Sequence, residues 1–164
     1  MQGLTEKRGW QPREMQMVSE WLVKTQQGKR WHTRVRLGSP SPAVPRPEMS
    51  LEEQAMIGGR RRWADAVILT PELVTIVEAA IRCEPGDISI LELYGRLFRH
   101  TPEFEPWASV PLSLLLLYAI EDPATILMAR EKGISCVEYK PLWLDGYLQI
   151  LQQRERRGHK KEEI

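Results

Sequence analysis

The sequence predicts an α/β fold in which a mixed central sheet is flanked on both sides by helices. Two observations support this prediction. Strand-like segments alternate with helix-like segments, and the second half of the chain reads helix, strand, helix, strand, helix. The continuous apolar run VPLSLLLLYAI is typical of a central strand that is covered on both faces. The 164 residues suffice for one domain with a buried core, so we expect a single domain over residues 1–164.

Composition excludes several classes of protein. Hydrophobic residues make up 42% and charged residues 27% of the chain, which is typical of a globular protein. The net charge is +1, so any contact with nucleic acid or a membrane requires a local patch. The two cysteines belong to no CxxC or Cys/His cluster, which argues against zinc and favours reduced thiols. The longest apolar run is roughly half of a membrane span, so we expect a cytoplasmic protein.

The first part of the chain predicts a helix followed by a charged strand. Residues 12–26 carry apolar side chains at helical spacing, with a proline at the start and Gly28 after the end. The segment KRWHTRVRLG then alternates strictly, which predicts a half-buried strand. The outer side of this strand carries Arg30, His32, Arg34 and Arg36. The three arginines can bind phosphates or partner carboxylates, or they can protect an edge strand, and the sequence leaves both open.

A proline-rich connection and a short helix come next. Residues 39–47 contain four prolines and predict an extended loop that is too short to separate two domains. Residues 50–59 predict a helix whose start carries a capping box made by Ser50 and Glu53. The helix leads to the basic triplet Arg60, Arg61 and Arg62.

The following segment predicts a hairpin with one acid in each strand. Strands are expected at residues 63–69 and 74–83, with the turn TPEL between them. A turn centred within TPEL places Asp65 opposite Glu78, so the two carboxylates would lie side by side on one face. A shift of one residue in register would separate them.

The rest of the chain predicts alternating helices and strands. The expected elements are a helix from about Gly86 to before Pro102, a strand over 110–120, a helix capped by Asp122 and stopped by Gly133, a strand over 134–141, and a last helix from Leu142 to about Arg157. The end of the chain, residues 154–164, is a charged tail.

The acid of the first hairpin strand is followed by IVEAAIR in the second strand and by PGDISILELYGRLF in a helix. This order of motifs resembles the PD-(D/E)XK nuclease superfamily, most closely its small bacterial and phage-type members. The resemblance covers nearly the whole chain in element order and implies a restriction-endonuclease-like core. It also implies DNA as a substrate and Mg²⁺ as the cofactor of an active site, because hard cations prefer carboxylate oxygens.

The resemblance also assigns roles to individual residues. Asp65 and Glu78 correspond to the two metal-binding acids, and Glu20 to the glutamate that relatives carry on the first helix. The lysine that relatives place two residues after the second acid is Ala80 here, and a helix position that is often glutamine is Ile90. Two polar positions have become apolar, which indicates a degenerate site.

Two other cations could replace the missing lysine. Arg82 follows Ala80 on the same side of the strand, and Lys140 ends a later strand. Arginine can orient or stabilise but cannot act as a base, because it stays protonated. The acids also have an ordinary structural interpretation as members of ion pairs. These pairs would join Asp65 to Arg61 or Arg62, and Glu78 to Arg82 or Arg36.

Two functions follow from this sequence. The favoured one is a nuclease-fold protein that does not cut and serves as a structural or binding part of a larger assembly, specifically a phage virion or assembly component. Its partners would be other protein subunits, with DNA as a second candidate, and it would reside in the host cytoplasm or the virion. The alternative is an active Mg²⁺-dependent deoxyribonuclease with a displaced cation. The candidate partner-binding residues are Arg30, Arg34, Arg36, Arg60, Arg61 and Arg62.

Overall fold

The computed structural model describes residues 12–40 and 46–162, with side chains up to residue 157. In chain order the elements are α1 (Pro12–Thr25), β1 (Arg30–Leu37), α2 (Leu51–Gly58), β2 (Arg62–Leu69), β3 (Val74–Arg82), α3 (Pro85–Phe98), η2 (Pro102–Trp107), β4 (Leu112–Ile120), α4 (Pro123–Glu131), β5 (Ser135–Glu138) and α5 (Leu144–Glu162). The expected order of helices and strands is confirmed. The 3-10 helix η2 is an addition. The middle of the proline-rich connection, residues 41–45, lies outside the described residues.

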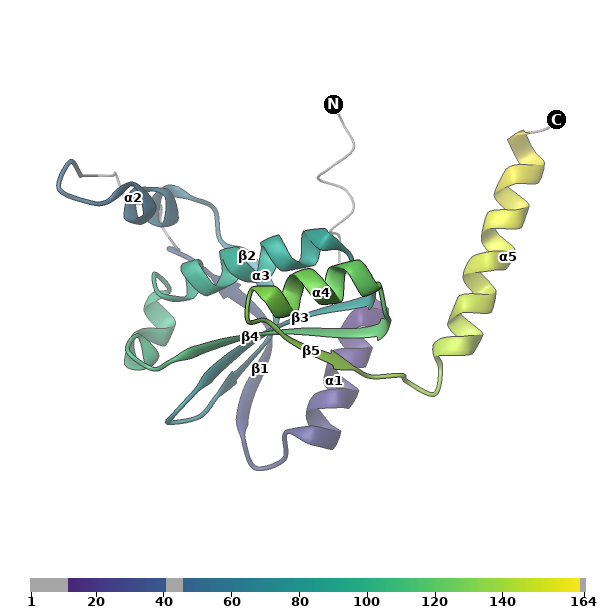
Figure 1. Ribbon diagram of the computed structural model, residues 1–164, viewed down its shortest axis with the longest axis horizontal. Helices are drawn as coiled ribbons and strands as arrows, with labels where there is room; N and C mark the ends of the chain where they lie inside the picture. The colour runs from purple at the N-terminus through teal and green to yellow at the C-terminus, as the bar shows by residue number, and fades with distance from the viewer. Residues whose placement is uncertain (1–11, 41–45, 163–164) are drawn as a thin grey trace.

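The five strands form one mixed sheet in the order β1-β2-β3-β4-β5. The pairs β1–β2 and β2–β3 are antiparallel, whereas the pairs β3–β4 and β4–β5 are parallel. Parallel neighbours require crossover connections, and α3 and α4 provide them. Figure 1 shows α3 and α4 together on one face of the sheet and α1 on the other. The predicted α/β fold with a mixed sheet covered on both sides is confirmed.

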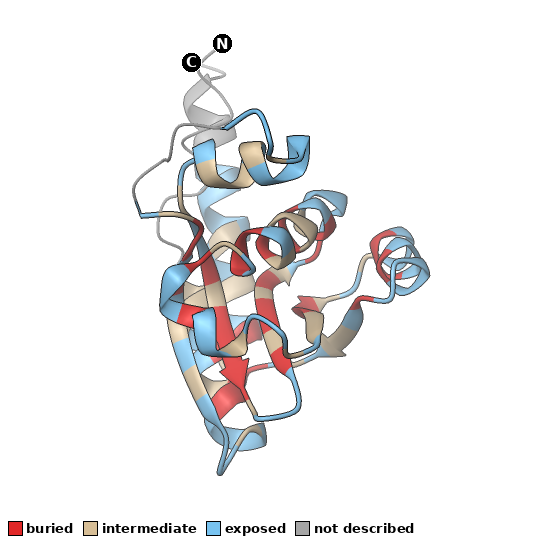
Figure 2. Cartoon of the chain, turned by 90° about the vertical axis from the view of Figure 1, so that its left-hand side faces the viewer, coloured by how far each residue is buried: buried red, intermediate tan, exposed pale blue. Residues whose placement is uncertain are grey.

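Two apolar clusters fill the space between the sheet and these helices. The α3-side core includes Val67, Val74, Ile76, Leu91, Phe98 and Leu116. The α1-side core includes Met17, Val18, Leu22, Val77, Ala79 and Leu117. Figure 2 shows the buried residues concentrated in the strands between the two helical layers. Neighbouring residues of β4, such as Leu116 and Leu117, point into opposite cores, which explains why this strand is apolar throughout.

Local signals account for several element boundaries. The capping box of α2 forms as expected, because Ser50 accepts from the Glu53 backbone and Glu53 accepts from the Ser50 backbone. Asp122 caps α4 by accepting from the backbone N–H of Thr125, also as expected. Gly133 follows α4 with a φ of 72°, a left-handed conformation that favours glycine. Both cysteines are free thiols, as the sequence indicates.

The last helix begins later and runs further than the sequence predicts. It spans Leu144–Glu162, so most of the expected charged tail is helical. Figure 1 shows α5 standing away from the layered body, which it joins through its first turns. Leu144 is buried in the α1-side core, and Leu148 packs against that core. Over the described residues, no helix is long and apolar enough to cross a membrane.

Candidate functional site

Asp65 lies where β2 loses its regular pairing with both of its neighbours, β1 and β3. The register of β1 with β2 places Arg34 opposite Asp65, and this single step is missing from the ladder. The ladder of β2 with β3 ends with Ala66 opposite Val77, one step short of Asp65 and Glu78. The predicted hairpin register is therefore confirmed, and the two acids come next in it, at the point where the pairing ends.

The Asp65 side chain occupies the place of a strand partner. Its Oδ2 atom accepts a hydrogen bond of 2.7 Å from the backbone N–H of Ala79 on β3. Asp65 is thus turned against the β3 backbone rather than projecting beside Glu78 from one face, as the sequence predicts. The reason is that β2 separates from β3 at this point and leaves backbone donors of β3 without a strand partner.

Both β1 and β2 change sides at this step. In a regular strand, residues two apart share a face. Ala64 nevertheless packs in the α3-side core and Ala66 in the α1-side core. On β1, Trp31 packs against the α1-side core and Val35 lies in the α3-side core. Between them Arg34 has a φ of 50°, which is a left-handed conformation that costs a non-glycine residue about 1–2 kcal/mol.

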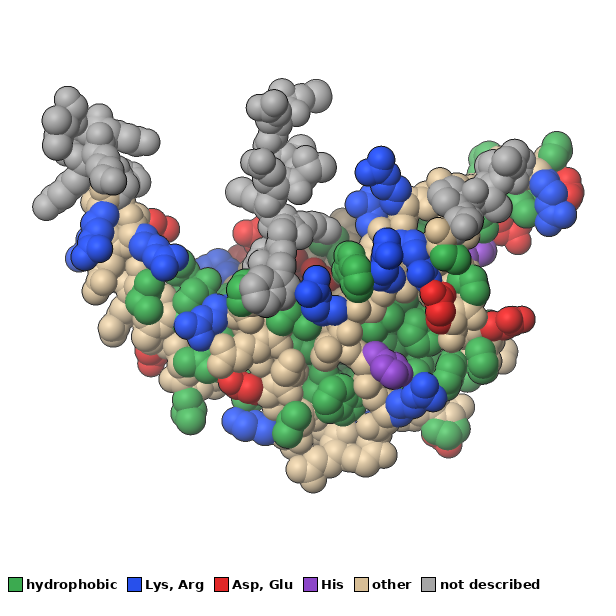
Figure 3. All heavy atoms as spheres, turned by 180° about the vertical axis from the view of Figure 1, so that it is seen from behind, with side chains coloured by type: hydrophobic (Ala, Val, Ile, Leu, Met, Phe, Trp, Pro, Cys, Tyr) green, Lys and Arg blue, Asp and Glu red, His purple; other side chains and the backbone are tan. Residues whose placement is uncertain are grey.

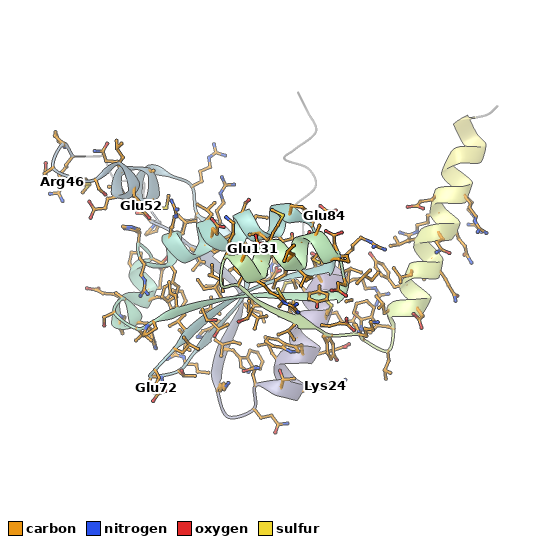
Figure 4. The ribbon with its side chains drawn as sticks, in the orientation of Figure 1. Lys24, Arg46, Glu52, Glu72, Glu84 and Glu131 are labelled. Atoms are coloured by element: carbon orange, nitrogen blue, oxygen red, sulfur yellow. The ribbon has the colours of Figure 1, made fainter. Side chains whose placement is uncertain are left out.

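Glu14, in the first turn of α1, adds a third carboxyl near Asp65 and Glu78. Its pKa rises from 4.5 to about 8, first because the side chain is largely buried and then because the charge of Asp65 is close. A hydrogen bond with the Ile81 backbone lowers the pKa, whereas the charges of Asp87 and Glu84 raise it further. Figure 4 labels Glu84 at the N-terminal end of α3.

Glu14 and Asp65 together replace the missing strand. Asp65 bonds to the backbone of Ala79, and Glu14 bonds to that of Ile81. In a strand, the N–H groups of residues two apart point toward the same neighbour. The two carboxyls therefore bind successive donors on the same edge of β3.

Burial is also the main influence on Asp65. It raises the pKa of Asp65 from 3.8 to about 6, against the hydrogen bond from Ala79, which lowers it. The charge of Asp87 raises this pKa and the positive charge of Arg34 lowers it. Glu78 is half-buried next to this place, with its Oε2 atom shielded from solvent. We call Glu14, Asp65 and Glu78 the carboxylate site.

The two positions where nuclease relatives carry polar side chains are part of the apolar core. Ala80 and Ile90 are each 6% exposed, and both lie in the α3-side core. Tyr94 keeps its hydroxyl near this region and donates to the backbone carbonyl of Trp63. The surroundings of Ala80 are thus those of a packed apolar side chain.

Glu20 does not belong to the carboxylate site, which corrects the sequence-based assignment. Its carboxylate accepts from the indole Nε1 of Trp143 at 2.9 Å and lies 3.4 Å from the hydroxyl of Tyr139. Glu14 and Glu20 are six positions apart, about 240° around a helix, so they cannot face the same place. The sequence did contain the signal: Glu14 extends the stripe of Met17, Val18, Trp21 and Leu22, the buried residues of α1.

The proposed substitute cations also lie elsewhere. Arg82 is exposed at the end of β3, near Asp122, whose pKa is lowered first by its hydrogen bonds with Thr125 and less by the charge of Arg82. Lys140 lies 3.4 Å from the carboxylate of Glu138. Neither contact brings a cation to the carboxylate site.

Arg61 differs from the rest of the basic triplet. Its guanidinium donates to the carbonyl of Gly38 at 3.1 Å and to the carboxylate of Glu103 at 2.6 Å. The sequence suggested Arg61 as a partner-binding residue, whereas in the structure its guanidinium is engaged by Gly38 and Glu103. Arg60 and Arg62 are exposed.

Two arginines of β1 gather around a tryptophan of β2. The guanidiniums of Arg34 and Arg36 lie 5.4 and 5.2 Å from the ring centre of Trp63. Trp63 is 51% exposed and both arginines are exposed. We call these three residues the arginine–tryptophan face. Figure 3 shows Lys and Arg side chains gathered around apolar ones on the side of the molecule seen from behind.

Arg30 forms a separate pair at the other end of β1. Its guanidinium lies 5.3 Å from the ring centre of Trp107, and its Nε atom lies 3.3 Å from the imidazole of His32. Arg30 is thus exposed but does not join Arg34 and Arg36 around Trp63.

The carboxylate site offers oxygen ligands, the kind that Mg²⁺ prefers. Among the residues that the structure describes, however, no three His, Cys, Asp or Glu side chains are grouped so that they could hold a metal ion. One oxygen of Asp65 is engaged with Ala79, and Glu20 lies against Trp143. The residues expected to hold Mg²⁺ are therefore not assembled around one point.

Comparison with known proteins gives little guidance. No known protein family matches the chain, and no curated protein is significantly similar to it. A solved structure described as a protein of unknown function, AF1548, resembles it with a TM-score of 0.47 and 10% identity. That likeness covers 79% of this chain and 60% of the other, so the chain spans less than two thirds of its neighbour's length. At this level of similarity the neighbour says nothing about what the chain does.

Proposed function

We propose that this chain is a non-catalytic, nucleic-acid-binding component of a larger assembly, built on a restriction-endonuclease-like core of the PD-(D/E)XK type. The order of elements, with Asp65 and Glu78 at the point where β2 and β3 separate, supports this core. On the sequence resemblance alone, we extend the proposal to a phage virion or assembly component.

The observation that carries the proposal is the environment of Ala80. This position lies in the apolar core at 6% exposure, where a nuclease of this type would have a lysine beside its acids. The positive charge that acts on Asp65 is that of Arg34, and arginine cannot exchange a proton with an attacking water at ordinary pH. The carboxyls of Glu14 and Asp65 serve the fold instead, as partners of the β3 backbone.

The arginine–tryptophan face supports contact with a polyanion. Exposed guanidiniums bind phosphate oxygens well, because they offer several charge-assisted hydrogen bonds in a fixed plane. Arg34 and Arg36 are both on the outer side of β1 and both exposed. Since the net charge of the whole chain is only +1, binding would depend on this local patch rather than on an overall field.

A second candidate function, a Mg²⁺-dependent nuclease, is favoured by one observation. Glu14 comes from the first helix and lies close enough to Asp65 for their charges to interact. A movement that released the two carboxyls from the β3 backbone would bring a third acid to the pair. We therefore keep this function as the alternative that experiments must exclude.

Binding can be tested by titrating labelled DNA with the wild-type chain and with an Arg34→Glu/Arg36→Glu variant. The proposal predicts binding by the wild type and a loss on the order of 10-fold or more for the variant, because two phosphate contacts become repulsive. An Arg96→Glu/Arg130→Glu variant, with the same change of charge at exposed positions of α3 and α4, is the matched control and should bind almost normally. Equal binding by both variants would contradict the proposed face.

A further inference from the structure

Trp63 is an unusual residue to leave on the surface of a sheet. It is 51% exposed, although it lies on β2, between the edge strand β1 and the central strand β3. Its cross-strand partner is Arg36, and Arg34 lies diagonally from it on the same strand. The ring is therefore presented at the surface, with one guanidinium on its direct neighbour and one on its diagonal neighbour.

The guanidiniums lie over the ring at exposed positions, and their charges also act on the carboxylates of Asp65 and Glu103. Their distances of 5.4 and 5.2 Å from the ring centre are those of cation–π pairs. At exposed positions such pairs are weak, so a base can displace a guanidinium from the ring when a phosphate is there to receive it. The face thus holds both parts of a nucleic-acid contact, a flat ring and two exposed cations.

The spacing of the two arginines suits an extended strand of phosphates. Residues two apart on a β-strand lie about 6.4–6.8 Å from each other, and here the guanidiniums of both lie over one aromatic ring. Arg34 reaches this arrangement through its left-handed backbone, at the step where β1 changes sides. The chain sustains that strain at the residue that lies opposite Asp65 and over Trp63.

The pair of Arg30 and Trp107 provides an internal comparison. The distance from the guanidinium to the ring centre is similar, 5.3 Å. Trp107, however, is partly buried, packs against the α3-side core and meets the ring of Phe104 edge-on. A base could not stack on it without disturbing the core. Trp63 differs by being exposed and by having two arginines.

We propose that Trp63, Arg34 and Arg36 form a binding site for single-stranded nucleic acid, in which a base stacks on Trp63 and the flanking phosphates bind the two arginines. A base can stack on a protein ring only when it is unpaired or flipped out, which is why the site selects single strands over duplexes. The inference rests on the proposed nucleic-acid-binding function and gives it a substrate class.

The test is a set of anisotropy titrations with three labelled probes. They are a single-stranded DNA of about 15 nucleotides, its duplex, and a strand of the same length in which abasic sites replace the central nucleotides. The wild type should bind the ordinary strand on the order of 10-fold more tightly than the abasic strand, since the latter keeps the phosphates but has no base to stack. It should also prefer the ordinary strand over the duplex.

Substitutions separate the ring from the cations. Trp63→Ala should lose the preference for bases and bind both strands equally, whereas Trp63→Phe should keep part of it. An Arg34→Gln/Arg36→Gln variant should weaken binding to both strands and reduce the slope of log K against log salt by about 0.7 for each phosphate that the variant no longer binds. Trp107→Phe is the matched control and should change neither preference, and thermal unfolding confirms that each variant is folded.

Each failure has a distinct meaning. If the wild type binds none of the three probes, both the proposed function and this inference are wrong. If it binds all of them but prefers the duplex, or if Trp63→Ala keeps the preference for bases, the inference is overturned and the proposed function survives.

Discussion

The carboxylate site and the arginine–tryptophan face meet on β2, where Asp65 belongs to the first and Trp63 to the second, yet their charged groups differ in burial. Asp65 is half-buried and bonded to the β3 backbone, and desolvation raises its pKa to about 6. Trp63, two positions earlier, is half exposed and has two guanidiniums over its ring. The comparison teaches that burial has made the acids part of the fold, while exposure has left the arginines available to a partner.

The largest expected effect concerns Glu14 and pH. The folded state favours the protonated form of Glu14, because folding raises the pKa of this carboxyl. The free energy of unfolding therefore falls as the pH rises from about 4.5 to about 8 and Glu14 loses its proton. At roughly 1.36 kcal/mol per pH unit, this range corresponds to about 5 kcal/mol, which we lower to about 4 kcal/mol because Glu14 is only half-buried and solvent screens its charge. Glu14→Gln should therefore raise the free energy of unfolding by about 4 kcal/mol at pH 9 and by little at pH 4.

Urea unfolding of the wild type and of Glu14→Gln at the two pH values measures this effect. Glu72, which Figure 4 shows at the far end of the hairpin, supplies the control. It is exposed, so Glu72→Gln should change the free energy of unfolding by less than about 0.5 kcal/mol at either pH. A gain for Glu14→Gln that is equal at both pH values would contradict the account of this buried carboxyl.

The second prediction compares a lysine at two neighbouring buried positions. Ala80 lies near the carboxylate site and Ala79 faces the α1-side core, with exposures of 6% and 2%. A lysine at position 79 would leave its charge unpaired in that core, at a cost of several kcal/mol. A lysine at position 80 could reach Asp65 and Glu78. Ala80→Lys should therefore retain about 2 kcal/mol more stability than Ala79→Lys, as measured by chemical denaturation.

Equal losses at the two positions would show that the acids no longer offer a lysine a partner. The chain would then lack both the catalytic lysine and a pair of acids able to stabilise one.

The sequence predicted the fold better than it predicted the site. The order of elements and the register of the hairpin follow from local patterns, such as the alternation in β1 and the capping box at Ser50. The side change at Arg34 and Asp65 could not be predicted, because it arises where β2 separates from β3 and leaves backbone donors for carboxyls to bind. Alternation alone assumes that the strands stay regular.

The choice between Glu14 and Glu20 shows a different kind of error. Both are acids of α1, and the sequence interpretation chose the one nearer the middle of the helix. The period of the buried residues Met17, Val18 and Trp21 would have selected Glu14. The structural role of Arg61 could not be predicted for another reason: its partner Glu103 comes from a distant segment of the chain.

A third prediction concerns the strained backbone at Arg34. Its φ of 50° is readily adopted by glycine but not by glutamine. Arg34→Gly and Arg34→Gln remove the same charge, so any difference between them reports the backbone. We expect Arg34→Gly to be more stable by about 1 kcal/mol in thermal or chemical unfolding. A glycine variant that is less stable than the glutamine variant would show that the residue is not strained.

The smallest effect separates two arginines of the basic triplet. Arg61→Gln should lower the free energy of unfolding by about 1 kcal/mol, because it breaks the contacts with Gly38 and Glu103. Arg62→Gln should change it by less than about 0.5 kcal/mol, because Arg62 is exposed. Chemical unfolding curves of the two variants measure this difference. A larger loss of stability for Arg62→Gln than for Arg61→Gln would contradict the structural role given to Arg61.

The most direct test of the account is whether DNA that is bound is also cut. Wild-type chain at saturating concentration is incubated with labelled single- and double-stranded DNA in Mg²⁺ or Mn²⁺, with Asp65→Ala alongside, and the products are resolved by length. The account predicts that DNA binds and stays intact, because Ala80 supplies no catalytic cation to the carboxylate site. Cleavage by the wild type that Asp65→Ala abolishes would contradict it and establish the nuclease.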